Sequence, residues 1–426
     1  MLTEVSKIEN TPSVSSHSVG IKGKLLIIGE RFFPEEFLIN DVVETLQKEG
    51  FEITVITQQP SYPYGKLFSG YEKRLFSTDN FHGATIIRTG VVEGYNKSVI
   101  RKILNYITFI LLGVWSVLTK VSKPDNILIY QTGPLSQAVI GIVAKWRFKK
   151  PLHIWTWDVW PDSIYAYGFK KTAVLSWFLN KFVSWVYRSC DKILVSSPAF
   201  SEIITKYAPK QPIEVLPNWI IEPVNQAVTS TIELPKGFNF TFTGNIGKVQ
   251  NLDNVIKGFA IAVKKDPTLY LNLVGDGSFI EDLKALVATQ HIANVKFWGR
   301  HPSEEMPAFY TASQALVISL NSDSVWELYI PSKFQAYLGA KKPIFAVIGG
   351  AVKDMVNQYK LGMSAEPNDI EDIAQAFLKI RNTNTALKAD IAHNANYLLS
   401  QYFDRNKNLD KLSRHLSSSS PFTPSV

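Results

Sequence analysis

The segment 327–343, with the sequence ELYIPSKFQAYLGAKKP, carries side chains suited to holding an anion. Pro331 and Ser332 precede a run with apolar periodicity, which is typical of a helix start. Ser332 and Gln335 also have the spacing of a capping box. Free amides at such a helix start, with Lys333 beside them, form an anion site. Glu327 lies just before this turn, where a carboxylate could meet sugar hydroxyls. The alternative is a capped helix that binds nothing.

Three glycine turns in the same half follow candidate strands. The sequence FTGNIGK at 242–248 lets backbone amides approach a phosphate, and VGDG at 274–277 and WGR at 298–300 are similar turns. Ligands of open α/β sheets bind at the carboxyl ends of strands, so we expect these turns to line one cleft together with 327–335. The candidate binding residues of this half are Gly244, Asn245, Gly247, Lys248, Gln250, Gly275, Asp276, Gly299, Arg300, Ser332, Lys333 and Gln335.

Polar and aromatic residues also follow candidate strands in the first half. Asp158 ends one such strand, where a base or a hydroxyl-binding group belongs, although it could equally be a turn or helix-capping aspartate. The loop PSYPYG at 60–65 presents Tyr62 and Tyr64 in the manner of loops that stack on sugar rings. The same loop could instead be a rigid surface turn.

Short β-branched runs alternate with helical patterns, which predicts βα repeats around parallel sheets. A polar stretch at 222–236 separates two such series. The predicted organisation is a disordered terminus at 1–20, Rossmann-like domains at 21–218 and 219–390, a helix at 391–412 that could cross back to the first domain, and a disordered tail at 413–426. The strand candidates are 25–29, 53–57, 84–88, 127–130, 152–156, 193–196, 213–216, 238–242, 269–274, 295–298, 315–319 and 344–347.

Composition narrows the class of protein. A chain of 426 residues exceeds one ordinary core and suits two domains. The single cysteine, Cys190, rules out an intramolecular disulfide framework and fits a reducing cytoplasm, and residues 1–20 lack the apolar core of a signal peptide. No aspartate pair stands at i and i+2, and the seven histidines lack metal-ligand spacing, so we expect no metal site.

Positive charge is concentrated in the first half. Residues 1–218 hold 25 Lys+Arg against 18 Asp+Glu, a net charge of +7, whereas the remainder holds 20 against 19. Eight of the ten tryptophans fall between Trp115 and Trp219. Basic and tryptophan-rich surfaces suit anionic lipid headgroups. Nucleic acid is the rival interpretation, but no nucleic-acid motif accompanies the charge, so we expect no nucleic-acid partner.

Two segments are candidates for membrane contact. Residues 103–118 (ILNYITFILLGVWSVL) carry no charge and have basic flanks, yet they are shorter than the roughly 20 residues that a spanning helix needs. This segment is a buried helix, an interfacial helix or a true span. Residues 170–188 (KKTAVLSWFLNKFVSWVYR) are either a core-facing helix or an interfacial anchor. We expect a cytoplasmic protein held peripherally on the inner face of the cytoplasmic membrane.

Taken in order, these motifs resemble glycosyltransferase family 4, and within it the bacterial O-antigen and capsule enzymes grouped with N-acetyl-L-fucosamine transferases. The similarity runs from about residue 24 to 379. Its remaining motifs are FFPEEFLIND (32–41), ITQQPSYPYGKLFSGY (56–71), WDVWPDS (157–163), DKILVSSPAF (191–200), VLPNW (215–219), FTGNIGKVQNLDNVI (242–256) and LVGDGS (273–278).

The resemblance implies an α/β fold of the GT-B type, in which two Rossmann-like domains face each other across a cleft. It places a nucleotide-sugar donor in the second domain and an acceptor in the first, near Glu36, Asn40, Tyr62 and Tyr64, and it implies retention of anomeric configuration. The family hallmark is two glutamates separated by seven residues. Here the first matches Glu327, while Gln335 stands at the second position as a weaker partner for hydroxyls.

A second departure concerns the donor diphosphate, because Asn245 and Gln250 stand where many members of this family have arginine and lysine. Lys248, Lys333 and the amides after Ser332 are the available substitutes. Asp158 matches the aspartate of the D-L-W-P motif of the fucosamine-transferase branch, and we assign it with Glu327 to catalysis.

These residues favour a metal-independent transferase without a cofactor. It would move a sugar, of N-acetylated deoxy- or amino-sugar type, from a UDP-sugar to a polyprenyl-diphosphate saccharide during surface-polysaccharide assembly. Two alternatives stay open. One is a UDP-sugar 2-epimerase of the same architecture, and the other is an inactive scaffold protein of the polysaccharide machinery.

Overall fold

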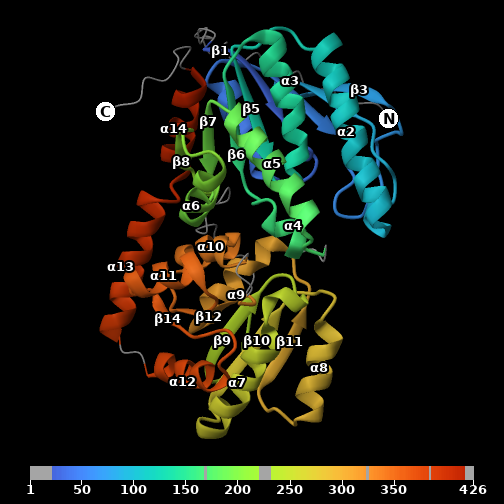
Figure 1. Cartoon of the computed structure of the whole chain (residues 1–426). Helices are drawn as coiled ribbons and strands as arrows, with labels where there is room; N and C mark the ends of the chain where they lie inside the picture. Colours follow the sequence, from blue (N-terminus) through green and yellow to red (C-terminus); the bar gives the residue numbers. More distant parts are fainter. Residues whose placement is uncertain (1–21, 167–169, 220–231, 323–325, 383–384, 418–426) are drawn as a thin grey trace, which may run out of the picture.

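Runs of aliphatic and β-branched residues form two sheets, one in each half of the chain (Figure 1). The computed structural model describes residues 22–166, 170–219, 232–322, 326–382 and 385–417. Each sheet carries helices on both faces, so the chain is an α/β protein with two parallel-sheet domains. The segments 1–20 and 418–426, which were predicted to be disordered, lie outside the described residues.

The first domain has an eight-stranded sheet of order β3-β4-β2-β1-β5-β6-β7-β8. All neighbouring strands are parallel except β3, which runs antiparallel to β4 at the edge. The seven strands predicted in this half are present, whereas the polar β3 (FSTDNF) was not predicted because it lacks an apolar pattern. The strands are β1 (Gly23–Ile28), β2 (Phe51–Gln58), β3 (Phe76–Phe81), β4 (Ala84–Thr89), β5 (Asn126–Gln131), β6 (Leu152–Thr156), β7 (Lys192–Val195) and β8 (Ile213–Val215).

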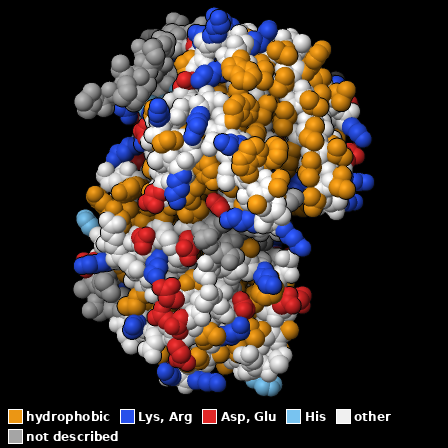
Figure 2. Space-filling model, in the orientation of Figure 1, with side chains coloured by type: hydrophobic (Ala, Val, Ile, Leu, Met, Phe, Trp, Pro, Cys, Tyr) orange, Lys and Arg blue, Asp and Glu red, His pale blue; other side chains and the backbone are white. Residues whose placement is uncertain are grey.

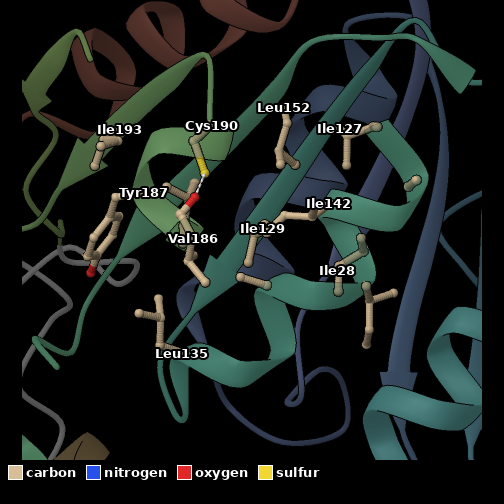
Figure 3. Close-up of a cluster of buried hydrophobic side chains, with 14 of the residues drawn as sticks. Ile28, Ile127, Ile129, Leu135, Ile142, Leu152, Val186, Tyr187, Cys190 and Ile193 are labelled. Carbon is tan, nitrogen blue, oxygen red and sulfur yellow. Dashed lines mark hydrogen bonds between the residues drawn. The ribbon is translucent and has the colours of Figure 1, made fainter. Parts of the chain in front are cut away.

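An apolar layer on each face of this sheet packs the strands against the helices. One face of the sheet packs against α2, α3, α5 and α6. Figure 3 shows part of this apolar layer, in which the thiol of the buried Cys190 donates to the Val186 carbonyl at 3.4 Å. The other face packs against α1 and α14. The helical elements of this domain are α1 (Leu38–Lys48), η1 (Tyr95–Lys97), α2 (Val99–Thr119), η2 (Leu135–Gln137), α3 (Ala138–Phe148), α4 (Asp162–Ala166), α5 (Ala173–Ser189) and α6 (Pro198–Tyr207).

The second domain has a six-stranded parallel sheet of order β11-β10-β9-β12-β13-β14. Its five predicted strands are present, and the short β14 was not predicted. The strands are β9 (Phe238–Thr243), β10 (Leu269–Val274), β11 (Val295–Gly299), β12 (Ala315–Ser319), β13 (Ile344–Val347) and β14 (Gly362–Ser364). The helical elements are η3 (Lys248–Gln250), α7 (Leu252–Lys265), α8 (Ile280–Thr289), η4 (Ser303–Glu305), α9 (Met306–Ala312), η5 (Trp326–Leu328), α10 (Ser332–Ala340), α11 (Gly350–Gln358) and α12 (Ile370–Arg381).

The C-terminal region forms two helices rather than the single one predicted at 391–412. Helix α13 (Thr385–Gln401) packs on α10, and α14 (Arg405–Ser417) returns to the first domain. Asp404 separates them because its carboxylate accepts the Lys407 amide at 2.8 Å and caps the new helix. The disordered tail predicted from 413 was wrong for 413–417, since Leu416 is buried and its carbonyl accepts from Asn126 at 2.7 Å.

The boundary between the domains also shifts slightly. The predicted second domain begins at 219, but Trp219 is buried in the apolar layer of the first domain. Its ring stacks on Trp155 with centroids 5.7 Å apart, and its indole donates to Asp41 at 2.9 Å. The linker between the domains therefore begins after Trp219.

Helices α2 and α5 expose apolar side chains that we call the apolar face. Figure 2 shows hydrophobic side chains gathered over these helices, with lysines and arginines around them. Within the described residues, α2 is the one helix whose length and composition would allow it to cross a membrane. The apolar face consists of Val99, Ile100, Ile103, Leu104, Ile107, Leu111, Trp115 and Leu118 from α2, and Val174, Trp177, Phe178 and Trp185 from α5.

Candidate active site

A cleft of about 850 Å³ lies between α1 of the first domain and the start of α10 in the second. The turns after β10 and β11 line a second hollow, so the prediction of one cleft lined by all three turns and residues 327–335 is met only in part. The turn after β9 and the first turn of α10 do meet at this cleft. Seven of the predicted site residues line it, and they come from both domains. They are Glu36, Asn40, Gly244, Asn245, Ser332, Lys333 and Gln335.

Lys333 is the central cation of this cleft. It is half-buried, and among the described residues its ammonium has no ion-pair or hydrogen-bond partner. The nitrogen lies 3.9 Å from the centre of the Phe242 ring. Burial lowers the pKa of Lys333 from 10.5 to about 7, because the charged form loses hydration without gaining a counter-ion. A cation held in this way gains most from an anionic ligand.

The glycine turn after β9 approaches this lysine closely at Gly244, which has no side chain. Gly244 has a φ of +120°, and a Cβ there would lie 3.2 Å from the Lys333 nitrogen. Gly275 approaches still more closely, since a Cβ there would lie 1.8 Å from the Gly244 carbonyl oxygen. The Gln250 side chain stabilises the turn by accepting the Gly247 amide at 2.9 Å. Lys248 is exposed, so Lys333 supplies the charge within the cleft.

A second hollow of about 500 Å³ adjoins the cleft and shares Gly244 and Asn245 with it. The predicted residues Tyr64, Gly275, Asp276 and Arg300 line it, so loops of both domains meet there. Gly299 does not line this hollow but supports it, because its carbonyl accepts the Gly275 amide at 2.8 Å.

Glu327 lies in η5, beside the turn that begins α11. A Cβ at Gly349 would approach its carboxylate oxygen to 2.4 Å, and a Cβ at Gly350 would approach its backbone carbonyl oxygen to 1.9 Å. Two consecutive glycines therefore make room for this glutamate. Glu327 lines neither hollow, so its contact with a donor sugar stays a prediction.

Asp158 joins the two domains. Its carboxylate accepts the hydroxyl of Tyr329 at 2.6 Å, and the Tyr329 ring meets Phe200 edge to face with centroids 5.1 Å apart. Desolvation raises the pKa of Asp158. This aspartate anchors a second-domain tyrosine against the first domain, and its assignment as a catalytic residue stays a prediction.

The predicted capping box at the start of α10 was wrong. Pro331 is the N-cap and makes no side-chain capping bond, because Ser332 already belongs to the helix. The Gln335 amide instead donates to the Asn218 backbone carbonyl at 3.1 Å and to its side-chain oxygen at 2.5 Å. The first turn of α10 therefore has no side-chain cap, and its residues Ser332 and Lys333 line the cleft. Gln335 ties the second domain to the end of the first domain, and its contact with a donor ribose stays a prediction.

Of the residues predicted to bind an acceptor, some line the cleft and others only support the loops beside it. Asn40, in the first turn of α1, lines the cleft and also holds the preceding loop, since it accepts the Phe33 amide at 3.0 Å and donates to the Glu35 carbonyl at 2.7 Å. Tyr62 lies outside both hollows and covers Arg31, whose guanidinium carbon is 5.1 Å from the ring centre. Sequence reasoning missed the buried Glu35, which holds the two loops together by accepting the Tyr62 amide at 2.7 Å.

Several other cleft residues were missed because their sequence context is apolar. Tyr337 is buried behind the glycine turn, where its hydroxyl accepts the Thr243 amide at 3.1 Å. Tyr310 and Met306 line the cleft from α9, and Trp219 lines it from the end of the first domain. Trp219 belongs to the VLPNW motif and Tyr337 to the segment 327–343, so these two residues lay in motifs that the sequence had already indicated. The described residues contain no cluster of three or more His, Cys, Asp or Glu side chains suited to a metal ion.

Comparison with known proteins identifies the family. Residues 38–219 match the glycosyl transferase 4-like domain, and residues 231–396 match the glycosyl transferases group 1 domain. The chain belongs to glycosyltransferase family 4. Both halves of this glycosyltransferase match, which decides against the epimerase alternative.

Two curated relatives of this glycosyltransferase come from bacteria. The probable glycosyltransferase WbjE of Pseudomonas aeruginosa is 26% identical over 58% of this chain, and the match spans 62% of that relative. The putative colanic acid biosynthesis glycosyl transferase WcaI of Escherichia coli K12 is 22% identical over 80% of this chain and 86% of its own length.

Solved structures share the whole two-domain architecture. Anabaena HepE in complex with UDP and glucose superposes with a TM-score of 0.65 at 15% identity, over 93% of this chain and 99% of that one. An E. coli structure described as trehalose-6-phosphate bound with UDP-2-fluoro glucose superposes with a TM-score of 0.70 at 11% identity and the same coverage. The GT-B fold predicted for this glycosyltransferase is thereby confirmed.

Proposed function

We propose that this glycosyltransferase moves a sugar from a UDP-sugar to a polyprenyl-diphosphate-linked saccharide in bacterial surface-polysaccharide synthesis, with retention of anomeric configuration. The name of the Escherichia coli relative, a putative colanic acid biosynthesis glycosyl transferase, supports a role in polysaccharide synthesis, and the UDP complex of a structural neighbour supports the nucleotide. The sugar would be an N-acetylated deoxy- or amino-sugar. No resident cofactor or metal takes part in this proposal.

The unpaired ammonium of Lys333 at the start of α10 carries the proposal. A leaving diphosphate needs positive charge at the place where negative charge develops. Lys333, the first turn of α10 and the glycine turn lie together in the cleft and would supply that charge. Closure of the two domains over the donor would exclude water and limit hydrolysis.

Donor binding is tested by calorimetry with UDP, ADP, GDP and CDP. We expect UDP to bind best in the wild type and at least about tenfold more weakly to Lys333→Gln, because a charge-assisted contact is lost. Lys248→Gln is the matched control, since this lysine is exposed outside the cleft. Equal UDP affinity in wild type and Lys333→Gln would place the phosphates elsewhere. Binding without any transfer to lipid-linked saccharides in a membrane extract would favour the inactive scaffold.

The apolar face supports peripheral attachment to a membrane. Helix α2 is fixed lengthwise on the first domain, because the buried Asn105 donates to Gln58 at 2.9 Å and Gly113 packs against Ile140. Its opposite side exposes Leu111 and Trp115. A helix held in this way favours contact with the bilayer surface over the spanning alternative.

Vesicle binding tests this attachment. We expect cosedimentation with vesicles containing phosphatidylglycerol and weaker binding to pure phosphatidylcholine, because basic residues near an anionic surface contribute about 1 kcal/mol each. Leu111→Glu and Trp177→Glu should each reduce binding, whereas Tyr397→Glu, an exposed aromatic of the second domain, should not. Binding that resists both high salt and mild detergent would instead support a spanning α2.

A further inference from the structure

A separate cavity of about 440 Å³ lies at the edge of the first sheet, where β3, β4 and the loop after residue 69 meet. It shares no lining residue with the two hollows of the cleft. Gln59 follows β2, Arg88 lies near the end of β4, and Ser77 is the register partner of Arg88 on β3. The cavity therefore runs along the β3 edge of the sheet and reaches the carboxyl ends of β2 and β4.

Two buried polar atoms beside this cavity have no partner among the described residues. Arg88 is 1% exposed, and its Nη1 makes no hydrogen bond although its other nitrogens bond Asp79 and the Phe33 carbonyl. Gln59 is 2% exposed, and its Oε1 is unpaired although its amide donates to Ser77 at 2.9 Å. A buried unpaired donor and acceptor are costly, and a ligand that offers both kinds of group would satisfy them.

The arginines that line the cavity are each paired with a carboxylate that also lines it. Arg88 pairs with Asp79, and Arg74 pairs with Glu72, so no cation is left to hold a phosphate or a carboxylate. Phe33, which is 44% exposed, offers a ring at the rim. Paired charges, amide and hydroxyl groups and an open aromatic ring suit a neutral ligand with hydroxyl groups and an apolar ring face.

We propose that this edge cavity is a subsite for a neutral sugar unit of the acceptor, one unit or more away from the unit that receives the donor sugar. The unpaired atoms of Arg88 and Gln59 would bond its hydroxyls, and Phe33 would pack on its ring. The continuity of the chain supports this assignment, because Phe33 at the cavity lies in the loop before α1, and its amide donates to Asn40 in the first turn of α1, which lines the cleft. The inference rests on the proposed function for the identity of the acceptor.

Direct binding can be measured without any transferase activity. Saturation-transfer NMR would use methyl glycosides of glucose, N-acetylglucosamine and fucose, with glucuronate and inorganic phosphate as anionic probes and UDP present throughout. We expect at least one neutral glycoside to bind, with an affinity about tenfold lower in Gln59→Leu, the loss typical of a hydrogen bond. We expect a loss of about the same size in Phe33→Ala, which removes the ring that packs on the sugar. Gln401→Leu and Tyr397→Ala, at exposed positions elsewhere, are the matched controls. Unchanged glycoside binding in both cavity variants, or tighter binding of the anions there, would overturn the subsite.

Kinetics on acceptors of increasing length separate this subsite from the proposed function. With polyprenyl-diphosphate mono-, di- and trisaccharides, Gln59→Leu and Phe33→Ala should match the wild type on the shortest active acceptor. Both should lose about tenfold in kcat/KM on the longest. An equal loss on every length, or no loss on any, would overturn the subsite while leaving the transferase intact. Glycoside binding at the cavity without any transfer would leave the subsite standing and overturn the proposed function instead.

Discussion

Lys333 should make donor binding depend on pH near neutrality. Burial holds the pKa of Lys333 at about 7 in the unliganded protein. A bound diphosphate favours the ammonium and raises this pKa in the complex, so binding takes up a proton above pH 7. Affinity should therefore be fully present below pH 7 and be lost as the pH rises through that value.

The size of the effect follows from the charged fraction of the lysine. Between pH 6.5 and 8.5 that fraction falls from about three quarters to about 3%, which weakens the apparent donor affinity roughly 25-fold. UDP-N-acetylglucosamine is the suitable probe, because both of its phosphates are diesters and keep one charge each through this range.

Calorimetry in buffers of different ionisation enthalpy measures both the affinity and the proton uptake. Lys333→Arg is the informative control, because a guanidinium stays charged throughout and should give a flat profile. Lys333→Gln should bind weakly at every pH. A wild-type profile as flat as that of the arginine variant, without proton uptake, would refute the role of Lys333.

The remaining predictions concern chemistry and domain contact. Glu327→Gln should lower the rate of transfer at least about 100-fold at unchanged donor affinity. Gly349→Ala should have the same effect, because its Cβ would collide with the Glu327 carboxylate. Full turnover of either variant in steady-state assays would contradict the prediction for that variant. Activity should persist in EDTA, and a loss restored by Mn²⁺ would contradict the metal-independent mechanism. Tyr329→Phe should cost about 1–3 kcal/mol of unfolding free energy in denaturant titrations, because Asp158 loses its hydroxyl donor; unchanged stability would show that this cross-domain bond contributes nothing.

Apolar and glycine patterns in the sequence were sufficient to predict both parallel sheets and the glycine turns of the second domain. These signals are local, since a buried parallel strand needs an apolar run and a close backbone approach needs a glycine. The edge strand β3 escaped prediction because antiparallel pairing with β4 stabilises its polar sequence. The break before α14 was missed for a different reason, since it depends on the cap from Asp404 and on packing against the first domain.

Within the site, residue types alone singled out Lys333 and the glycines that face it. Only the tertiary structure gave Gln335 its contact with Asn218 and Asp158 its contact with Tyr329, because each partner lies more than 100 residues away. The edge cavity is likewise a product of folding. Gln59, Ser77 and Arg88 carry no recognisable motif, and they meet because β2, β4 and β3 lie side by side in the sheet. Sequence patterns report what each segment prefers locally, whereas the pairing of distant polar groups is decided by how the sheets and the two domains pack.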